Sequence, residues 1–80
     1  MMTQPLSLRM TRSDVSRNMA RFYFLSLQPT LFGEVMLIRN WGRIGTAGQT
    51  RFETFSEEEA AFVALHRLRC QKIKKGYCAD

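Results

Sequence analysis

Alternation of apolar and polar residues predicts three strands in the middle of the 80-residue chain. The first covers residues 20–28, "ARFYFLSLQ", the second residues 34–41, "EVMLIRNW", and the third residues 49–55, "QTRFETF". Between the first two, "PTLFG" supplies a proline and a glycine for a reversal, so these strands are expected to form an antiparallel hairpin. A glycine-rich stretch then separates the second strand from the third.

A helix is expected to follow the third strand. Ser56, with Glu59 three residues later, has the pattern of a capping box, which predicts a helix that begins near Glu57. Acidic residues in the first turn and basic residues in the last turn complement the helix dipole, and Gly76 is expected to end the helix. The apolar stripe that should pack on the sheet comprises Ala61, Ala64, Leu65 and Leu68.

These elements predict an α+β fold, with an antiparallel sheet of three to four strands and one C-terminal helix packed on one face. The fourth strand is an edge strand that "PLSLRMTR", residues 5–12, could add, and "SDVSRN" after it has the composition of a turn or a short helix. We therefore expect residues 1–19 to be an N-terminal extension and residues 20–77 to be the main domain.

The first predicted strand has a second apolar face. Phe22 and Phe24 lie opposite Tyr23, Leu25 and Leu27, and a single helix covers only one side of a sheet. Exposed aromatic patches often mark interfaces. We therefore expect either that residues 5–19 cover this face or that the chain forms a homodimer through Phe22 and Phe24.

Charge narrows the class of partner. Twelve Lys and Arg against seven Asp and Glu give a net charge of +5, and the surplus lies near the two ends of the chain. Such a field favours a polyanion, nucleic acid before an anionic membrane surface, although a solvated basic face is the alternative. No apolar run reaches the ~18 residues of a membrane span, and the N-terminus lacks a signal-peptide pattern. We expect a cytoplasmic protein with no membrane partner, and two cysteines fit a reducing compartment.

The single Trp of the chain, Trp41, lies between Arg39 and Arg43 and directly before the glycines. An aromatic ring flanked by guanidinium groups can stack on a sugar or a base while arginine binds phosphate. The alternative is a core Trp with solvated arginines, because Trp is highly buried on average. Gly42 allows the close backbone approach that either a tight turn or a phosphate requires.

The segment "NWGRIGTAGQ", with "VMLIR" before it and a strand and helix after it, resembles the WGR domain, a module named for its Trp-Gly-Arg motif. The resemblance covers about residues 20–77, and it includes "LQPTLFGEV" and the terminal "KKGY" that are typical of short stand-alone bacterial members. The motif residues correspond to Trp41, Gly42 and Arg43. In the DNA-damage-dependent poly(ADP-ribose) polymerases, this domain is a sheet with a helix against it that binds DNA near a strand break.

The resemblance implies that Trp41 packs on the sugar of a terminal nucleotide and that Arg43 couples the domain to its neighbours. No zinc finger, helical regulatory domain or transferase domain fits within 80 residues. For Arg43 we therefore expect a phosphate contact or a buried structural hydrogen bond instead.

The basic end of the predicted helix is a second candidate contact. Lys72 falls close to the apolar stripe, so its stem could lie along the sheet with its ammonium group at the rim, in reach of phosphate. The alternative is that the lysines only complement the helix dipole and aid solubility. The complete predicted nucleic-acid site comprises Trp41, Gly42, Arg43, Arg39, Arg51, Lys72, Lys74 and Lys75.

The predicted function is a non-enzymatic nucleic-acid-binding module that binds DNA ends or breaks, with RNA as a further ligand class. The alternative is a protein-protein interaction module with Trp41 and Arg43 as interface anchors. His66 and Cys70 are four residues apart on the helix, but no third group orients them as a catalytic pair. One His and two Cys are fewer than the four usual zinc ligands. We expect no catalytic residues, no cofactor and no metal.

Overall fold

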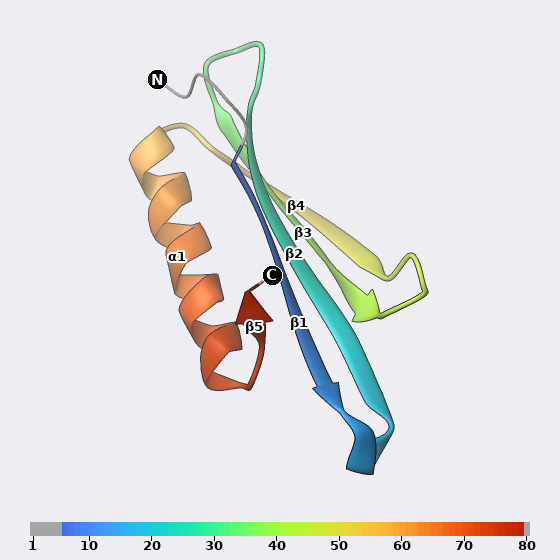
Figure 1. The fold of residues 1–80 in the computed structure, drawn as a ribbon. Coiled ribbons are helices and arrows are strands. Elements are labelled where there is room, and N and C mark those ends of the chain that lie inside the picture. The colour runs from blue at the N-terminus through green and yellow to red at the C-terminus, as the bar shows by residue number, and fades with distance from the viewer. Residues whose placement is uncertain (1–5, 80) are drawn as a thin grey trace.

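One antiparallel sheet carries a single helix on one face in the computed structural model, which describes residues 6–79 (Figure 1). In the described residues, five strands pair in the order β4-β3-β2-β1-β5, so the predicted count of three to four strands is wrong. The α+β class, the antiparallel sheet and the helix on one face are confirmed. The elements are β1 (Leu6–Asp14), the 3-10 helix η1 (Val15–Arg17), β2 (Met19–Pro29), β3 (Val35–Arg43), β4 (Gln49–Phe55), α1 (Glu58–Lys74) and β5 (Cys78–Ala79).

The number of strands is larger than predicted because both β1 and β5 join the sheet. Strand β1 pairs with β2 along its whole length, from Leu6 opposite Leu27 to Asp14 opposite Met19. Strand β5 then pairs with the outer side of β1 over two residues only. Sequence alternation could indicate β1, but a two-residue strand has no periodicity to detect.

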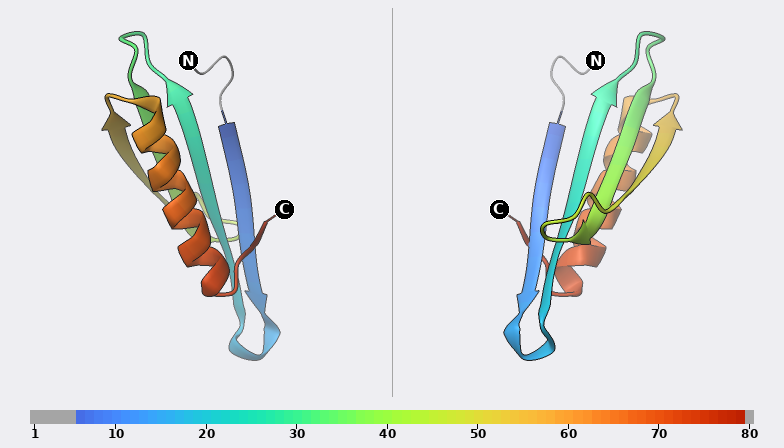
Figure 2. Two further views of the ribbon diagram at one scale, coloured as in Figure 1. Left: turned by 90° about the vertical axis from the view of Figure 1, so that its left-hand side faces the viewer. Right: turned by 90° about the vertical axis from the view of Figure 1, so that its right-hand side faces the viewer.

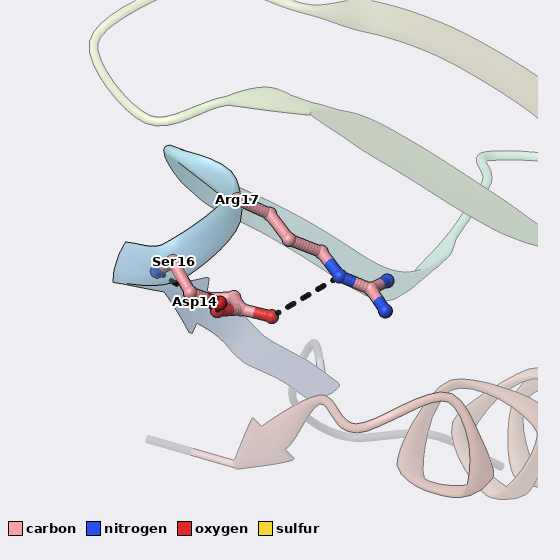
Figure 3. A network of polar contacts seen from close by, with 3 residues as sticks. All are labelled: Asp14, Ser16 and Arg17. Atoms are coloured by element: carbon pink, nitrogen blue, oxygen red, sulfur yellow. Dashed lines mark hydrogen bonds and ion pairs between the residues drawn. The ribbon is translucent and has the colours of Figure 1, made fainter.

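The turn between β1 and β2 is closed by a local polar network (Figure 3). Asp14 Oδ1 accepts hydrogen bonds from the Ser16 amide at 3.1 Å and from the Ser16 hydroxyl at 2.6 Å. Arg17 Nε lies 3.6 Å from Asp14 Oδ2. The Ser16 side-chain hydrogen bond, with weaker help from backbone amides and Arg12, lowers the pKa of the Asp14 carboxyl. Asn18 ends the turn in the left-handed conformation, with φ 50°.

The core lies between α1 and the sheet. Met10, Leu25, Leu27 and Leu37 are fully buried there, and each such side chain contributes about 1.5 to 3 kcal/mol relative to an exposed position. The predicted helix stripe is confirmed, because Ala61 and Leu65 are buried in this core and Ala64 and Leu68 pack against it. The remaining buried members of the cluster are Tyr23, Val35 and Tyr77.

The predicted capping box at the start of the helix is wrong. Glu57, one residue after Ser56, is the N-cap, and no side chain caps the helix. The first helical hydrogen bond runs from the Ala61 amide to the Glu57 carbonyl at 3.3 Å. Ser56 therefore stands one residue too early for its hydroxyl to reach the free amides of the first turn.

The C-terminal end of α1 is closed as expected by Gly76. Gly76 has φ 102°, and its amide donates to the Ile73 carbonyl at 3.0 Å, while the Tyr77 amide donates to the Lys72 carbonyl at 3.0 Å. These two bonds form a Schellman motif, in which a left-handed glycine turns the chain away from the helix axis. The turn directs Tyr77 into the core and leads the chain to β5.

The second face of the sheet is covered in part by the glycine-rich turn between β3 and β4, which crosses it on the side away from α1 (Figure 2, right). A Cβ atom built on Gly48 would lie 3.0 Å from the Phe22 ring, and Phe22 is only 7% exposed. The turn therefore covers Phe22 within one chain, so Phe22 does not need residues 5–19 as its cover. The homodimer through Phe22 and Phe24 stays a prediction. Phe24 on the same face is half-buried.

Asn40 fixes this turn in place. Its side-chain amide donates to the Ala47 carbonyl at 3.1 Å, the Gln49 carbonyl at 2.9 Å and the Thr50 hydroxyl at 3.1 Å. A Cβ atom on Gly42 would lie 2.7 Å from the Gly48 Cα atom, so the two glycines are in direct contact. The turn can fold back onto β3 only because both positions lack side chains.

Within residues 6–79, no helix is both long enough and apolar enough to cross a membrane.

Gly48→Ala should destabilise the protein more than Gly45→Ala. Both glycines have positive φ, 70° and 97°, so both substitutions carry the left-handed cost of about 1 to 2 kcal/mol. A Cβ atom on Gly48 would in addition collide with the Trp41 carbonyl, whereas a Cβ atom on Gly45 meets nothing within 4 Å. Urea unfolding of the two variants measures the difference, and equal midpoints would contradict the packing of the turn.

Candidate nucleic-acid interface

The candidate site lies on the face of the sheet that α1 covers, where the β1–β2 hairpin extends beyond the C-terminal end of the helix (Figures 1 and 2). In the register of β2 and β3, Tyr23 is opposite Trp41 and Arg21 is opposite Arg43. Directly opposed residues of antiparallel strands point to the same face, as do alternate residues of one strand. These four side chains therefore continue the buried face of the sheet past the end of the helix.

Trp41 is half-buried and packs against the edge of the core. Its ring is stacked on Tyr23, with a centroid separation of 6.0 Å and an interplanar angle of 22°. The Arg39 guanidinium lies 5.9 Å from the Trp41 ring centroid, within the range of a cation–π contact. The ring is thus held in a fixed orientation by core contacts, and part of it remains open to solvent.

An open cleft of about 550 Å³ lies beside the ring. Three arginines line it, Arg17 and Arg21 from the β1–β2 hairpin and Arg43 from the end of β3. The other lining residues are Asn18, Met19, Ala20, Trp41, Gly42, Gly48, Gln49 and Tyr77. The cleft therefore combines cationic side chains, an aromatic surface and glycine backbone.

Arg43 links the end of β3 to the turn between β1 and β2. Its Nη2 atom donates a hydrogen bond of 2.8 Å to the Asn18 carbonyl in the β1–β2 turn. The Arg43 carbonyl accepts from the Thr46 hydroxyl at 2.8 Å, which ties the glycine-rich turn to the same residue. A guanidinium group carries five donors, so this structural bond leaves room for a further acceptor.

Lys72 lies against Tyr23 and against Tyr77, which lines the cleft. Its Nζ atom is 4.5 Å from the Tyr23 ring centroid and 5.8 Å from the Tyr77 ring centroid. Burial, together with the nearby charges of Lys75 and Arg39, lowers the pKa of Lys72 below its ordinary value. The ammonium group is thus held over aromatic faces in a partly desolvated position among other cations.

The structure brings together some of the predicted site residues and separates others. Trp41, Gly42 and Arg43 line the cleft, and Arg39 lies against the Trp41 ring. Arg51 is exposed on β4, opposite Arg39, and Lys74 and Lys75 are exposed at the end of α1.

Sequence reasoning missed Arg17, Arg21 and Tyr77 as cleft residues. The basic surplus of the first 22 residues pointed to this region, but only the β2–β3 register shows which arginines lie near Trp41.

The pair on the outer side of α1 lies apart from this cleft. Cys70 Sγ is 3.6 Å from His66 Nε2, and His66 is exposed. In the described part of the chain, no group of three or more His, Cys, Asp and Glu side chains is placed to hold a metal ion.

Comparisons with known proteins give the family. The sequence model of the WGR domain matches residues 6–80. The chain is 49% identical over 77 residues to the uncharacterized protein y4dW of Sinorhizobium fredii, a match that covers 96% of this chain and 38% of that protein. It is 45% identical over 38 residues to protein YehF of Escherichia coli, over 48% of this chain and 14% of that protein. The chain thus spans well under half of either relative. No solved structure matches it significantly.

The Lys72 ammonium group should titrate at lower pH in the folded protein than in the unfolded chain. Between those two pKa values the unfolded chain binds more protons, so the Lys72 contribution to stability rises with pH across that window. The NMR chemical shifts of the Lys72 side chain, followed through a pH titration, measure the folded value. A midpoint at or above that of the unfolded chain would contradict the desolvated position of Lys72.

Proposed function

The chain belongs to the WGR domain family, and from this premise we propose that it binds DNA and holds the end or break of a strand in the cleft beside Trp41. WGR domains are generally nucleic-acid-binding modules in proteins of the poly(ADP-ribose) polymerase type. The observation that carries the proposal is the cleft, in which three arginines converge beside a fixed aromatic ring and glycine backbone.

The charges of the cleft favour an anionic ligand. Arg21 and Arg43 are directly opposite each other on adjacent strands, an arrangement that destabilises the free protein. Arg17 adds a third guanidinium group, which the half-buried Asp14 carboxylate offsets only in part because Arg17 itself is solvent-exposed. A phosphate group between the arginines would turn mutual repulsion into two charge-assisted contacts.

The shape of the cleft favours a terminal nucleotide. Its volume of about 550 Å³ lies within the range of sites that enclose a small ligand, so it can hold one nucleotide-sized group at its base. The Trp41 ring provides a flat surface for a sugar or a base, while the absence of side chains at Gly42 and Gly48 lets the backbone of a strand approach.

The remaining basic residues extend this surface. We assign Lys72, Lys74, Lys75, Arg39 and Arg51 to contacts with the phosphates that follow the terminal nucleotide. Because phosphate contacts release counterions, their joint contribution should depend steeply on salt. The proposal is a binding role without catalysis, since His66 and Cys70 lie on the outer side of α1, away from the cleft.

Use of Trp41 and Arg43 as anchors for a protein partner has weaker support. Both residues are already engaged within the chain, Trp41 with Tyr23 and Arg43 with the Asn18 carbonyl. Interface anchors fill pockets on a partner, whereas these side chains line a cleft of their own protein.

Trp41→Leu should weaken binding to DNA ends by about five- to a hundredfold, because stacking on a nucleotide is worth about 1 to 3 kcal/mol. Leucine keeps an apolar side chain against the core, so the loss of stability should stay below the ~3 kcal/mol of a full Trp truncation. Fluorescence anisotropy with a labelled blunt-ended duplex, together with thermal melting, measures both effects. A folded variant with unchanged DNA affinity would exclude Trp41 as the stacking surface.

Arg21→Gln should weaken DNA binding and reduce the slope of log affinity against log salt by about 1, because one phosphate contact is lost. Arg67→Gln is the matched control, since Arg67 is an exposed arginine on α1 that does not line the cleft. Competition between linear and closed-circular DNA of one sequence tests end preference in the same assay. Equal competition by the circle would contradict end binding, and preferential binding of single-stranded RNA would replace DNA as the ligand.

A further inference from the structure

Among residues 6–79, no strand pairs with the outer edge of β4. Strand β4 pairs with β3 on one side and is the last strand in the order β4-β3-β2-β1-β5. Its seven residues contain neither proline nor lysine, the residues that most often block an edge. The opposite edge, by contrast, ends in the two-residue strand β5. The β4 edge therefore presents a row of backbone donors and acceptors that another strand can pair with.

The sequence of β4 is complementary to itself. When two copies of "TRFET", residues 50–54, run antiparallel with Phe52 at the centre, Phe52 is opposite Phe52 of the second copy. In this register Arg51 is opposite Glu53 of the second copy, and Glu53 is opposite Arg51. Thr50 and Thr54 are paired in the same way at the two ends. Opposite charges, aromatic pairs and Thr pairs are the cross-strand combinations that stabilise antiparallel sheets.

The isolated chain leaves these side chains without such partners. Phe52 is 62% exposed, on the face of the sheet away from α1. Arg51 is opposite Arg39 of β3, so its only cross-strand neighbour carries the same charge. In the part of the chain that the structure describes, neither Arg51 nor Glu53 forms an ion pair.

We propose that β4 pairs antiparallel with β4 of a second copy of this chain, centred on Phe52, so that the two sheets become one continuous sheet. The two-fold axis then runs perpendicular to the sheet, and both helices lie on the same face. Each Arg51 is placed between Arg39 of its own chain and Glu53 of the second copy, which offsets the like-charge repulsion. The two Phe52 rings meet on the other face, beside Ile38 of each chain.

This dimer goes beyond the proposed DNA binding and does not rest on it. Pairing of one short strand buries less area than the ~1,200 Å² of a stable interface, so the dimer should be weak and reversible. Sedimentation equilibrium over about a hundredfold range of protein concentration, in the absence of DNA, should show a monomer–dimer equilibrium.

Charge reversal tests the register. Arg51→Glu places Glu opposite Glu53 of the second copy, and Glu53→Arg places Arg opposite Arg51. Each single variant should dimerise at least about tenfold more weakly than the unchanged chain, because two attractive pairs become repulsive. The double variant R51E/E53R should regain the dimer, and an equimolar mixture of the two single variants should form a heterodimer.

Arg17→Glu, in the exposed β1–β2 turn that β3 separates from β4, is the matched control and should leave the dimer unchanged. Circular dichroism and thermal melting confirm that each variant is folded, since the changed side chains are exposed. A chain that stays monomeric at the highest concentration would overturn the proposal. Single variants that dimerise as well as the unchanged chain, or a double variant that does not regain the dimer, would also overturn it.

Discussion

The structure depends on a mismatch of length between one helix and the sheet beneath it. The 17 residues of α1 extend about 25 Å, whereas the 11 residues of β2 extend about 36 Å. One helix of this length cannot cover the whole face, so in the described part of the chain the sheet continues past the end of α1 with no second helix over it. The chain fills the boundary with Tyr77 and Lys72, which lie against Tyr23. Beyond that boundary the same face changes from leucines to arginines, and this is where the cleft forms.

The position of Trp41 at this boundary explains why sequence reasoning could not choose between a core ring and a displayed one. The β2–β3 register places Trp41 opposite Tyr23, which is the last core residue on its strand. A ring in that position stabilises the fold through its inner contacts, and the rest of its surface stays exposed, where the proposed nucleotide would stack. The core reading of Trp41 describes the inner side of the ring, and the displayed reading describes its outer side. The position at which α1 ends decides how much of the ring is buried.

Local patterns in the sequence indicated most of the elements but few of the long-range contacts. The three central strands, the helix stripe and the stop at Gly76 follow from periodicity and composition, which act over a few residues. The burial of Phe22 could not be predicted in the same way. It depends on the contact of Gly48 with Gly42 and on the hydrogen bond from the Asn40 side chain to the Ala47 carbonyl, which holds the turn in place. The cleft was equally hidden. Arg17 and Arg21 are 24 and 20 residues from Trp41 in the sequence, and only strand pairing brings them together.

Two arginines of β3 are each directly opposite an arginine of a neighbouring strand, Arg43 opposite Arg21 of β2 and Arg39 opposite Arg51 of β4. Repulsion between the like charges of each pair destabilises the isolated fold. Arg21 and Arg43 face each other in the cleft, so a phosphate group can lie between them. Arg39 and Arg51 face each other near the free edge of the sheet, where Glu53 of a second copy can come within reach. Like-charge repulsion thus favours a phosphate group at the Arg21–Arg43 pair, which borders the cleft, and a second strand at the Arg39–Arg51 pair, which lies near the edge of the sheet. The Arg21–Arg43 pair therefore concerns DNA binding alone, whereas Arg51 belongs both to the proposed phosphate contacts and to the proposed dimer.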